Sequence, residues 1–203
     1  DVIGTLPTPL ESREFLDDKR PDKRARLVDR LLKRTEYADY WALKWADLLR
    51  VDRLTLGHQR AYRYYRWIRD SFADNLPLDQ FTRQLLTATG PVSENPAAIF
   101  YQVIGGPGDR AAVVSQVFLG MRIECAQCHH HPYDRWSQTD YWGMQAFFTQ
   151  IAFKPGPGGS SIVATGAAKT KHPRSGREVF AHALETGMPD ASPPGDRRKL
   201  LAN

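Results

Sequence analysis

The residues best suited to chemistry lie in one short run, Cys125-Ala126-Gln127-Cys128-His129. Its two cysteines are the only ones in the chain. Cys-x-x-Cys-His is the attachment signature of c-type haem. Two thiols at this spacing can bond to the two vinyl groups of one porphyrin, and the adjacent imidazole can ligate the iron from the same side. The run therefore predicts one covalent haem c, anchored by Cys125 and Cys128, with His129 as an axial ligand.

Three other interpretations of the cysteines stay open. A disulfide or thioredoxin-like redox pair would call for a βαβ pattern, which the sequence lacks. Zinc could use the cysteines with His129 or His131, but a tetrahedral site needs four ligands and no second ligand pair follows. The cysteines could also be unrelated free thiols. Haem is favoured because the complete signature is present.

Apolar and aromatic residues flank the motif on both sides, as a porphyrin requires a wall that excludes water. The expected haem pocket consists of Phe118, Met121, Tyr133, Trp136, Tyr141, Trp142 and Phe147. Most of these side chains could equally be ordinary core. Arg122 and Arg135 could pair with the haem propionates or lie on the surface.

The sequence does not decide the sixth ligand of the iron. The candidates are His58, His130, His131, His172, His182, Met121, Met144 and Met188. Met188-Pro189 is similar to the late Met-Pro ligand of small cytochromes, but a single methionine more often serves in packing. An open sixth position would favour catalysis or gas binding over electron transfer.

Hydrophobic spacing predicts a mainly α fold, an irregular multi-helix domain around the haem site with a loop-rich C-terminal tail. Residues 1–20 are expected to form a polar N-terminal segment, and Pro21 suits the first turn of a helix. Further helices are expected over 37–51 and 58–74, and around 81–86 before the stop at Gly90-Pro91. Another should run from Asp109, as its N-cap, to Leu119. A Ser137/Asp140 capping box should open a helix reaching about Ile151, and a last one could begin at 197.

The composition changes after residue 153. Residues 154–161 are rich in proline and glycine and predict a loop or linker. Residues 162–190 show no clean periodicity and are expected to be irregular, with a short strand at most. The predicted organisation is a helical haem-binding domain over 1–153, followed by a linker and irregular segment over 154–203. That segment would pack on the domain or lead to a following one.

The net charge of +5 and the pI of about 9.3 favour acidic partners, such as an anionic polysaccharide or an acidic redox protein. Arginines interleaved with aromatics over residues 60–69 could suggest nucleic acid, but an amphipathic helix explains the pattern better, and no nucleic-acid partner is expected. No apolar run approaches the ~20 residues of a membrane span. No signal peptide is visible, and since Asp1 is no initiator, the chain is expected to be a processed or excised piece.

The longest specific run extends from Phe118 to Trp136 and reads FLGMRIECAQCHHHPYDRW. It continues with the stretch Ser137-Gln138-Thr139-Asp140-Tyr141 and the aromatic segment Ala146-Phe147-Phe148. This pattern resembles the planctomycete-type cytochrome-c-like domain family, domain of unknown function 1549, which is usually followed by a partner domain. Residues 27–32, 45–50 and 75–81 also fit that family, and residues 195–202 look like the lead into the partner domain.

The resemblance implies a large secreted multidomain protein and hence an extracytoplasmic location. By this resemblance, Cys125 and Cys128 are the cysteines that form the thioether bonds, and His129 is the axial ligand of the iron. The family pattern also keeps a histidine at His131 and an aspartate at Asp134, which implies for His131 a distal or second-shell role, or a role as ligand of another metal. His130 departs from the pattern and receives no role. The resemblance supplies no reaction.

The leading functional hypothesis is a mono-haem c-type domain that passes electrons to a redox partner or to an adjacent domain of the same protein. One alternative is a haem-dependent enzyme acting on an extracellular substrate such as a polysaccharide, with His131, Asp134 and Arg135 as distal groups. Another is a structural module whose Cys/His cluster holds a metal. Whether the protein is an enzyme, and which residues would be catalytic, is left open.

Overall fold

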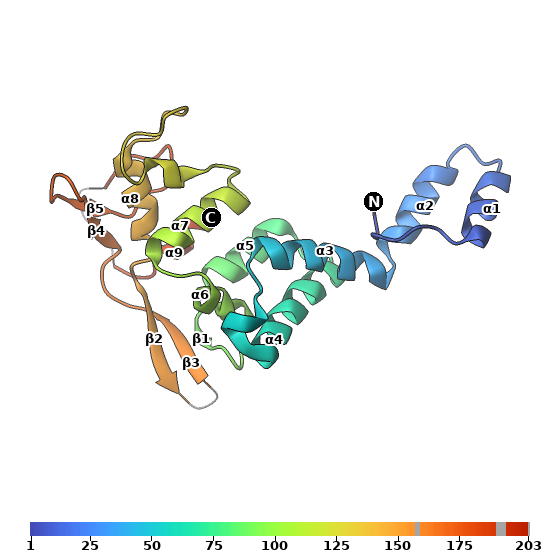
Figure 1. Ribbon diagram of the computed structural model, residues 1–203, viewed down its shortest axis with the longest axis horizontal. Coiled ribbons are helices and arrows are strands. Elements are labelled where there is room, and N and C mark those ends of the chain that lie inside the picture. The colour runs from blue at the N-terminus through green and yellow to red at the C-terminus, as the bar shows by residue number, and fades with distance from the viewer. Residues whose placement is uncertain (157–158, 190–193, 203) are drawn as a thin grey trace.

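The computed structural model describes residues 1–156, 159–189 and 194–202 (Figure 1). About half of the chain is helical, and two small sheets complete the fold. The prediction of a mainly helical chain is therefore confirmed at the level of fold class. In the part that the structure describes, no helix is both long and apolar enough to cross a bilayer.

Two long helices form the centre of the helical body, α3 (Thr35–Leu48) and α4 (Arg53–Ala73). The buried residues of α3 are all alanines, at positions 38, 42 and 46, so α4 can approach it closely. Asp52 caps α4 by accepting from the backbone N–H groups of residues 54 and 55, each at 2.9 Å. Gly57, with a φ of +74°, interrupts α4 just before the predicted start at residue 58. Both helices therefore form where the hydrophobic spacing places them.

Shorter helices continue the body toward the cysteine motif. They are α5 (Leu78–Leu86), η1 (Pro96–Ile99), α6 (Phe100–Val103), α7 (Pro107–Phe118), η2 (Ile123–Ala126) and α8 (Gln138–Ala146). The prediction of Asp109 as the N-cap of α7 is wrong. Gly106 is the N-cap, Pro107 opens the helix, and the Asp109 carboxylate reaches back to the Gly106 N–H at 3.2 Å.

The capping box that opens α8 is confirmed. The Ser137 hydroxyl accepts from the Asp140 N–H at 3.2 Å, and the Asp140 carboxylate accepts from the Ser137 N–H at 2.7 Å. The predicted end near Ile151 is wrong, because α8 stops at Ala146 and Ile151 begins a strand. Residues from Ile151 on pair antiparallel with the segment that directly follows them, and this pairing takes them out of the helical stretch.

The predicted loop over 154–161 instead contributes to a hairpin. Strands β2 (Ile151–Gly156) and β3 (Gly159–Ala164) pair antiparallel, and β1 (Gly90–Pro91) pairs with the other side of β3. Residues 157–158 of the predicted loop lie outside the described residues. Prolines 91 and 155 are on the two outer strands, where a missing N–H is tolerated. The glycine and proline content of residues 154–161 therefore predicted a loop where most of the described residues form strands.

The segment after the hairpin is more ordered than predicted. It forms strands β4 (Lys169–Lys171) and β5 (Glu178–Phe180), which pair antiparallel, and helix α9 (Arg198–Leu201). Residue 190 of the predicted irregular stretch and residue 203 of the last predicted helix lie outside the described residues. Ile162, Ala168 and Val179 are buried, so residues beyond 153 add to the packed interior.

An unpredicted helix lies near the N-terminus, α1 (Pro9–Asp17). Thr8 and Glu11 form a capping box and Pro9 occupies the first turn, a signal within the segment expected to be merely polar. Helix α2 (Lys23–Leu32) follows, and together the two form an arm that projects from the rest of the chain (Figure 1). The arm is attached to α3, since the Trp41 indole N–H donates to the Val2 carbonyl at 3.1 Å and Arg34 pairs with Glu11 at 2.8 Å.

Candidate functional site

The cysteine motif lies on a short turn between α7 and α8. In η2, Ile123 and Ala126 are fully buried, whereas Cys125 and Cys128 are exposed and carry free thiols. The alternation follows from the tight helical turn, in which the two apolar side chains face the body and the thiols face outward. Two exposed, unpaired thiols are the form of cysteine that thioether formation requires.

A buried amide fixes this turn to the next helix. Gln138, the first residue of α8, donates from Nε2 to the backbone carbonyl of Gln127 at 2.8 Å. Gln127 is one of the two residues between the cysteines, so this bond positions the motif directly. Sequence reasoning did not identify Gln138 as a site residue. The signal that could have suggested it is its position directly after Ser137, the predicted cap of the helix.

The imidazole of His129 is exposed, and its Nδ1 lies 2.5 Å from the carbonyl oxygen of His130. A carbonyl can only accept, so Nδ1 carries the proton and Nε2 has its lone pair free. Metal-ligating histidines characteristically donate one ring N–H to such an acceptor while the other nitrogen binds the metal. The local geometry therefore suits His129 to ligate through Nε2.

His131 makes hydrogen bonds within the loop that follows the motif. The His131 N–H donates to the Trp136 carbonyl at 2.8 Å, and its Nδ1 accepts from the Tyr133 N–H at 3.3 Å. The Asp134 carboxylate accepts from the N–H of Arg135 at 2.8 Å. Both side chains thus hold the shape of the loop.

Arg135 connects this loop to the C-terminal part. Its guanidinium pairs with the carboxylate of Glu185 and lies 4.8 Å from the centroid of the Trp136 ring. The coil that contains Glu185 also carries Met188, which is exposed. Sequence reasoning missed Glu185, because no local pattern links positions fifty residues apart.

The residues expected to form the haem pocket do not all share one environment. Trp136, Tyr141 and Phe147 are buried in the main core, and Phe118, Met121 and Trp142 pack against it. Tyr133, by contrast, is 95% exposed. Six of the seven expected pocket residues therefore belong to the core or pack against it, whereas the side chain of Tyr133 is exposed on the loop.

Tyr141 lies close enough to the cysteine motif to interact with it electrostatically. Burial is the main cause that raises the pKa of its phenol, with further electrostatic contributions from Glu124, Asp109 and Cys128. The indole N–H groups of Trp136 and Trp142 are buried without a hydrogen-bond partner among the described residues. Buried unpaired donors are uncommon and call for an acceptor that protein atoms do not supply.

A surface pocket of about 410 Å³ opens beside Cys125, lined by Ala112, Gln116, Arg122, Glu124 and Cys125. The free thiols of Cys125 and Cys128 and the exposed imidazole of His129 are the side chains that a covalently held haem would need. Among the described residues, no group of three or more His, Cys, Asp or Glu side chains gathers in a way that could hold a metal ion by itself.

The other candidates for the sixth ligand are scattered. Met144 is buried in the core, whereas His58 and His130 are exposed. His172 accepts from two backbone N–H groups in the turn between β4 and β5. Of these side chains the structure singles out none as the ligand.

His182 occupies a specific niche against α8. It is 4% exposed, its Nδ1 lies 2.9 Å from the Phe180 carbonyl, and its Nε2 lies 3.7 Å from the Asp140 carboxylate. The ring sits over Gly143, where an added Cβ would fall 2.1 Å from it. His182 thereby attaches the C-terminal segment to the helix that positions the cysteine motif.

Four of the five arginines of α4 are paired within the chain. Arg60 donates to the Leu56 carbonyl, Arg63 to that of Ser93, and Arg69 pairs with Asp39 at 2.7 Å. Arg66 pairs with Asp70 at 3.6 Å. These contacts agree with the interpretation of α4 as an amphipathic helix.

The fold and the site together define a mostly helical domain that presents an exposed Cys-x-x-Cys-His turn. Residues 1–153 match the family model PSCyt2, described as a protein of unknown function (DUF1549), and the chain belongs to that family. No curated protein and no solved structure matches the chain.

Proposed function

We propose that this chain is a mono-haem c-type domain that transfers electrons within a larger extracytoplasmic protein. The single observation that carries the proposal is the Cys-x-x-Cys-His turn with both thiols free and outward. The hydrogen bond from His129 Nδ1 supports it, because it leaves Nε2 available to iron. A bound haem supplies one-electron redox chemistry at iron.

Each residue of the site has a role in this proposal. Cys125 and Cys128 hold the haem by thioether bonds, and His129 ligates the iron. Arg122, which lines the pocket beside Cys125, would meet an anionic propionate. Trp136 and Tyr141, which are buried in the core and close to the motif in sequence, would limit access of water to the haem.

The alternative of a haem enzyme draws less support. His131 and Asp134 are engaged in holding their loop, and Arg135 is paired with Glu185. Groups committed to local structure are poorly placed to move protons or bind an anionic substrate. Electron transfer demands only that the haem be held and accessible to a partner.

The test is production of the chain together with the cytochrome c maturation machinery, followed by intact mass and a pyridine haemochrome spectrum. We expect the mass of one added haem in the wild type and loss of stable attachment in the double variant Cys125→Ala/Cys128→Ala. His129→Ala should keep the covalent haem and change its spectrum, whereas His130→Ala, the matched control, should change neither. A wild-type mass equal to that of the bare chain would end the proposal.

A second measurement separates electron transfer from catalysis. Low-spin iron that does not bind carbon monoxide supports the electron-transfer role, because both axial positions are then filled. High-spin iron that binds carbon monoxide supports the enzyme instead.

A further inference from the structure

The N-terminal arm displays apolar side chains that nothing in the described chain covers. Helices α1 and α2 contain no buried residue. Leu16 of α1 is 67% exposed, and Leu6 just before the helix is 91% exposed. Contiguous exposed apolar side chains typically mark an interaction site.

An apolar pocket of about 390 Å³ lies between α1, α2 and the N-terminal residues. Its apolar lining includes Ile3, Leu6, Phe15, Leu16, Leu27 and Leu31. A concave apolar surface between two helices suits the apolar face of a third helix, which inserts side chains at spacings of three and four residues.

A cationic hollow of about 550 Å³ adjoins this pocket. It is lined by Arg20, Lys23, Arg26, Arg30 and Lys33, together with Glu14, Asp18 and Asp29. Phe15 and Leu27 line both spaces, so they form the shared wall. A segment that passes over these two side chains would contact both spaces.

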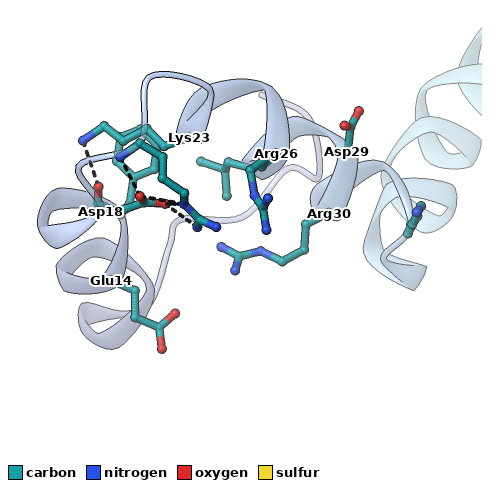
Figure 2. A pocket seen from close by; sticks show the side chains of 10 residues that line it. Glu14, Asp18, Lys23, Arg26, Asp29 and Arg30 are labelled. Atoms are coloured by element: carbon teal, nitrogen blue, oxygen red, sulfur yellow. Dashed lines mark hydrogen bonds and ion pairs between the residues drawn. The ribbon is translucent and has the colours of Figure 1, made fainter.

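The cations of the hollow are not all neutralised. Asp18 is occupied by Arg20, with its carboxylate 2.6 Å from the guanidinium, and Lys23 donates to the Phe15 carbonyl at 3.1 Å. Over the described ranges, the guanidinium groups of Arg26 and Arg30 have no hydrogen-bond or ion-pair partner. Figure 2 shows both guanidinium groups extending from α2 into the hollow, while the Asp29 carboxylate points to the other side of the helix.

We propose that this arm is a docking site for an acidic amphipathic protein segment. The apolar face of the segment would fill the pocket between the helices, and its carboxylates would meet Arg26 and Arg30. A sulfated polysaccharide or a nucleic acid would satisfy the guanidinium groups but leave the apolar pocket unfilled. This inference is independent of haem attachment, since the arm and the cysteine turn lie at opposite ends of the helical body (Figure 1).

The probe is a synthetic helical peptide of about fifteen residues with leucines at positions spaced by three and four and glutamates elsewhere. Its affinity for the full chain is measured by fluorescence anisotropy. The Arg26→Glu/Arg30→Glu variant should weaken binding about tenfold or more, and Leu16→Ser should weaken it several-fold. Binding to the wild type should also weaken as salt is raised.

Matched controls lie on the same two helices outside both pockets. Arg24→Glu and Leu10→Ser make the same kinds of change at exposed positions and should alter affinity by less than about twofold. A scrambled peptide of identical composition tests whether amphipathic order matters, and it should bind at least about tenfold more weakly.

Three outcomes would overturn the proposal. Equal affinity for the scrambled peptide would indicate a site for any polyanion, and tighter binding of heparin or single-stranded DNA would assign it to those ligands. Self-association of the wild-type chain that Leu16→Ser abolishes, measured by analytical ultracentrifugation, would assign the surface to a second copy.

Discussion

The side-chain amide of Gln138 donates to the main-chain carbonyl of Gln127 at 2.8 Å, across the base of the cysteine turn. Gln138 begins α8, whose start is fixed by the reciprocal bonds between Ser137 and Asp140. The position of the two cysteines therefore depends on where a neighbouring helix begins. A helix cap, rather than the motif itself, sets the geometry of the site.

Replacing this amide should loosen the turn. Gln138→Ala removes a buried donor and is expected to lower the free energy of unfolding by about 1 kcal/mol. It should also reduce the yield of covalent haem, because Gln127 lies between the two anchors. Urea denaturation and haem yield from parallel cultures measure the two effects. Gln80→Ala, at an exposed position of α5, should alter neither.

Gly143 should not tolerate a side chain. In Gly143→Ala the new Cβ would lie within 2.6 Å of three atoms of the His182 ring, so that ring must leave its niche. We expect a loss of about 1–3 kcal/mol of stability, measured by denaturation. Gly187→Ala is the matched control, since an added Cβ there meets no atom within 4 Å.

The double variant Gly143→Ala/His182→Ala isolates the cause of that loss. If the clash with the ring is responsible, the two changes together should cost at least about 1 kcal/mol less than the sum of the single variants. Strict additivity would show that Gly143 acts through the helix backbone instead.

Arg198 should be essential for attachment of α9. Its side chain is fully buried, pairs with Asp196 at 2.6 Å and donates to the Ala88 carbonyl at 3.1 Å. Arg198→Met would leave the Asp196 carboxylate without its partner, and breaking a buried pair in this way typically costs about 3–5 kcal/mol. Thermal unfolding measures the change. Lys199→Met, at the exposed next position, should be within about 0.5 kcal/mol of the wild type.

Acid should break the ion pair between Arg34 and Glu36 at the start of α3. The Arg34 guanidinium, at 2.5 Å, is the main cause that lowers the pKa of Glu36 from its ordinary 4.5 to about 2. Because the pKa is lower in the folded chain, the stabilisation is present above about pH 4.5 and is lost as pH falls through about 2. Side-chain NMR titration should give a low midpoint for Glu36, and Arg34→Gln should move it toward 4.5. A midpoint near 4.5 in the wild type would contradict the ion pair.

Local signals identified the central features of this chain. The Ser137/Asp140 cap and the helical spacing of residues 37–51 and 58–74 are encoded within a few residues, so they could be read directly. The same holds for the cysteine motif, because its chemistry depends on spacing along the chain. The Thr8/Glu11 cap was equally local and was overlooked.

The tertiary structure alone decided the partners that lie far apart in sequence. The pairing of β1 with β3, the ion pair of Arg135 with Glu185 and the niche of His182 join segments separated by tens of residues. Such contacts form when the collapsed chain buries apolar surface and satisfies its polar groups, and no local periodicity encodes them. The sequence by itself determined which residues could bind a haem. Only the packing of the folded chain showed which of these side chains are free and face outward. It also showed which of them hold the loop.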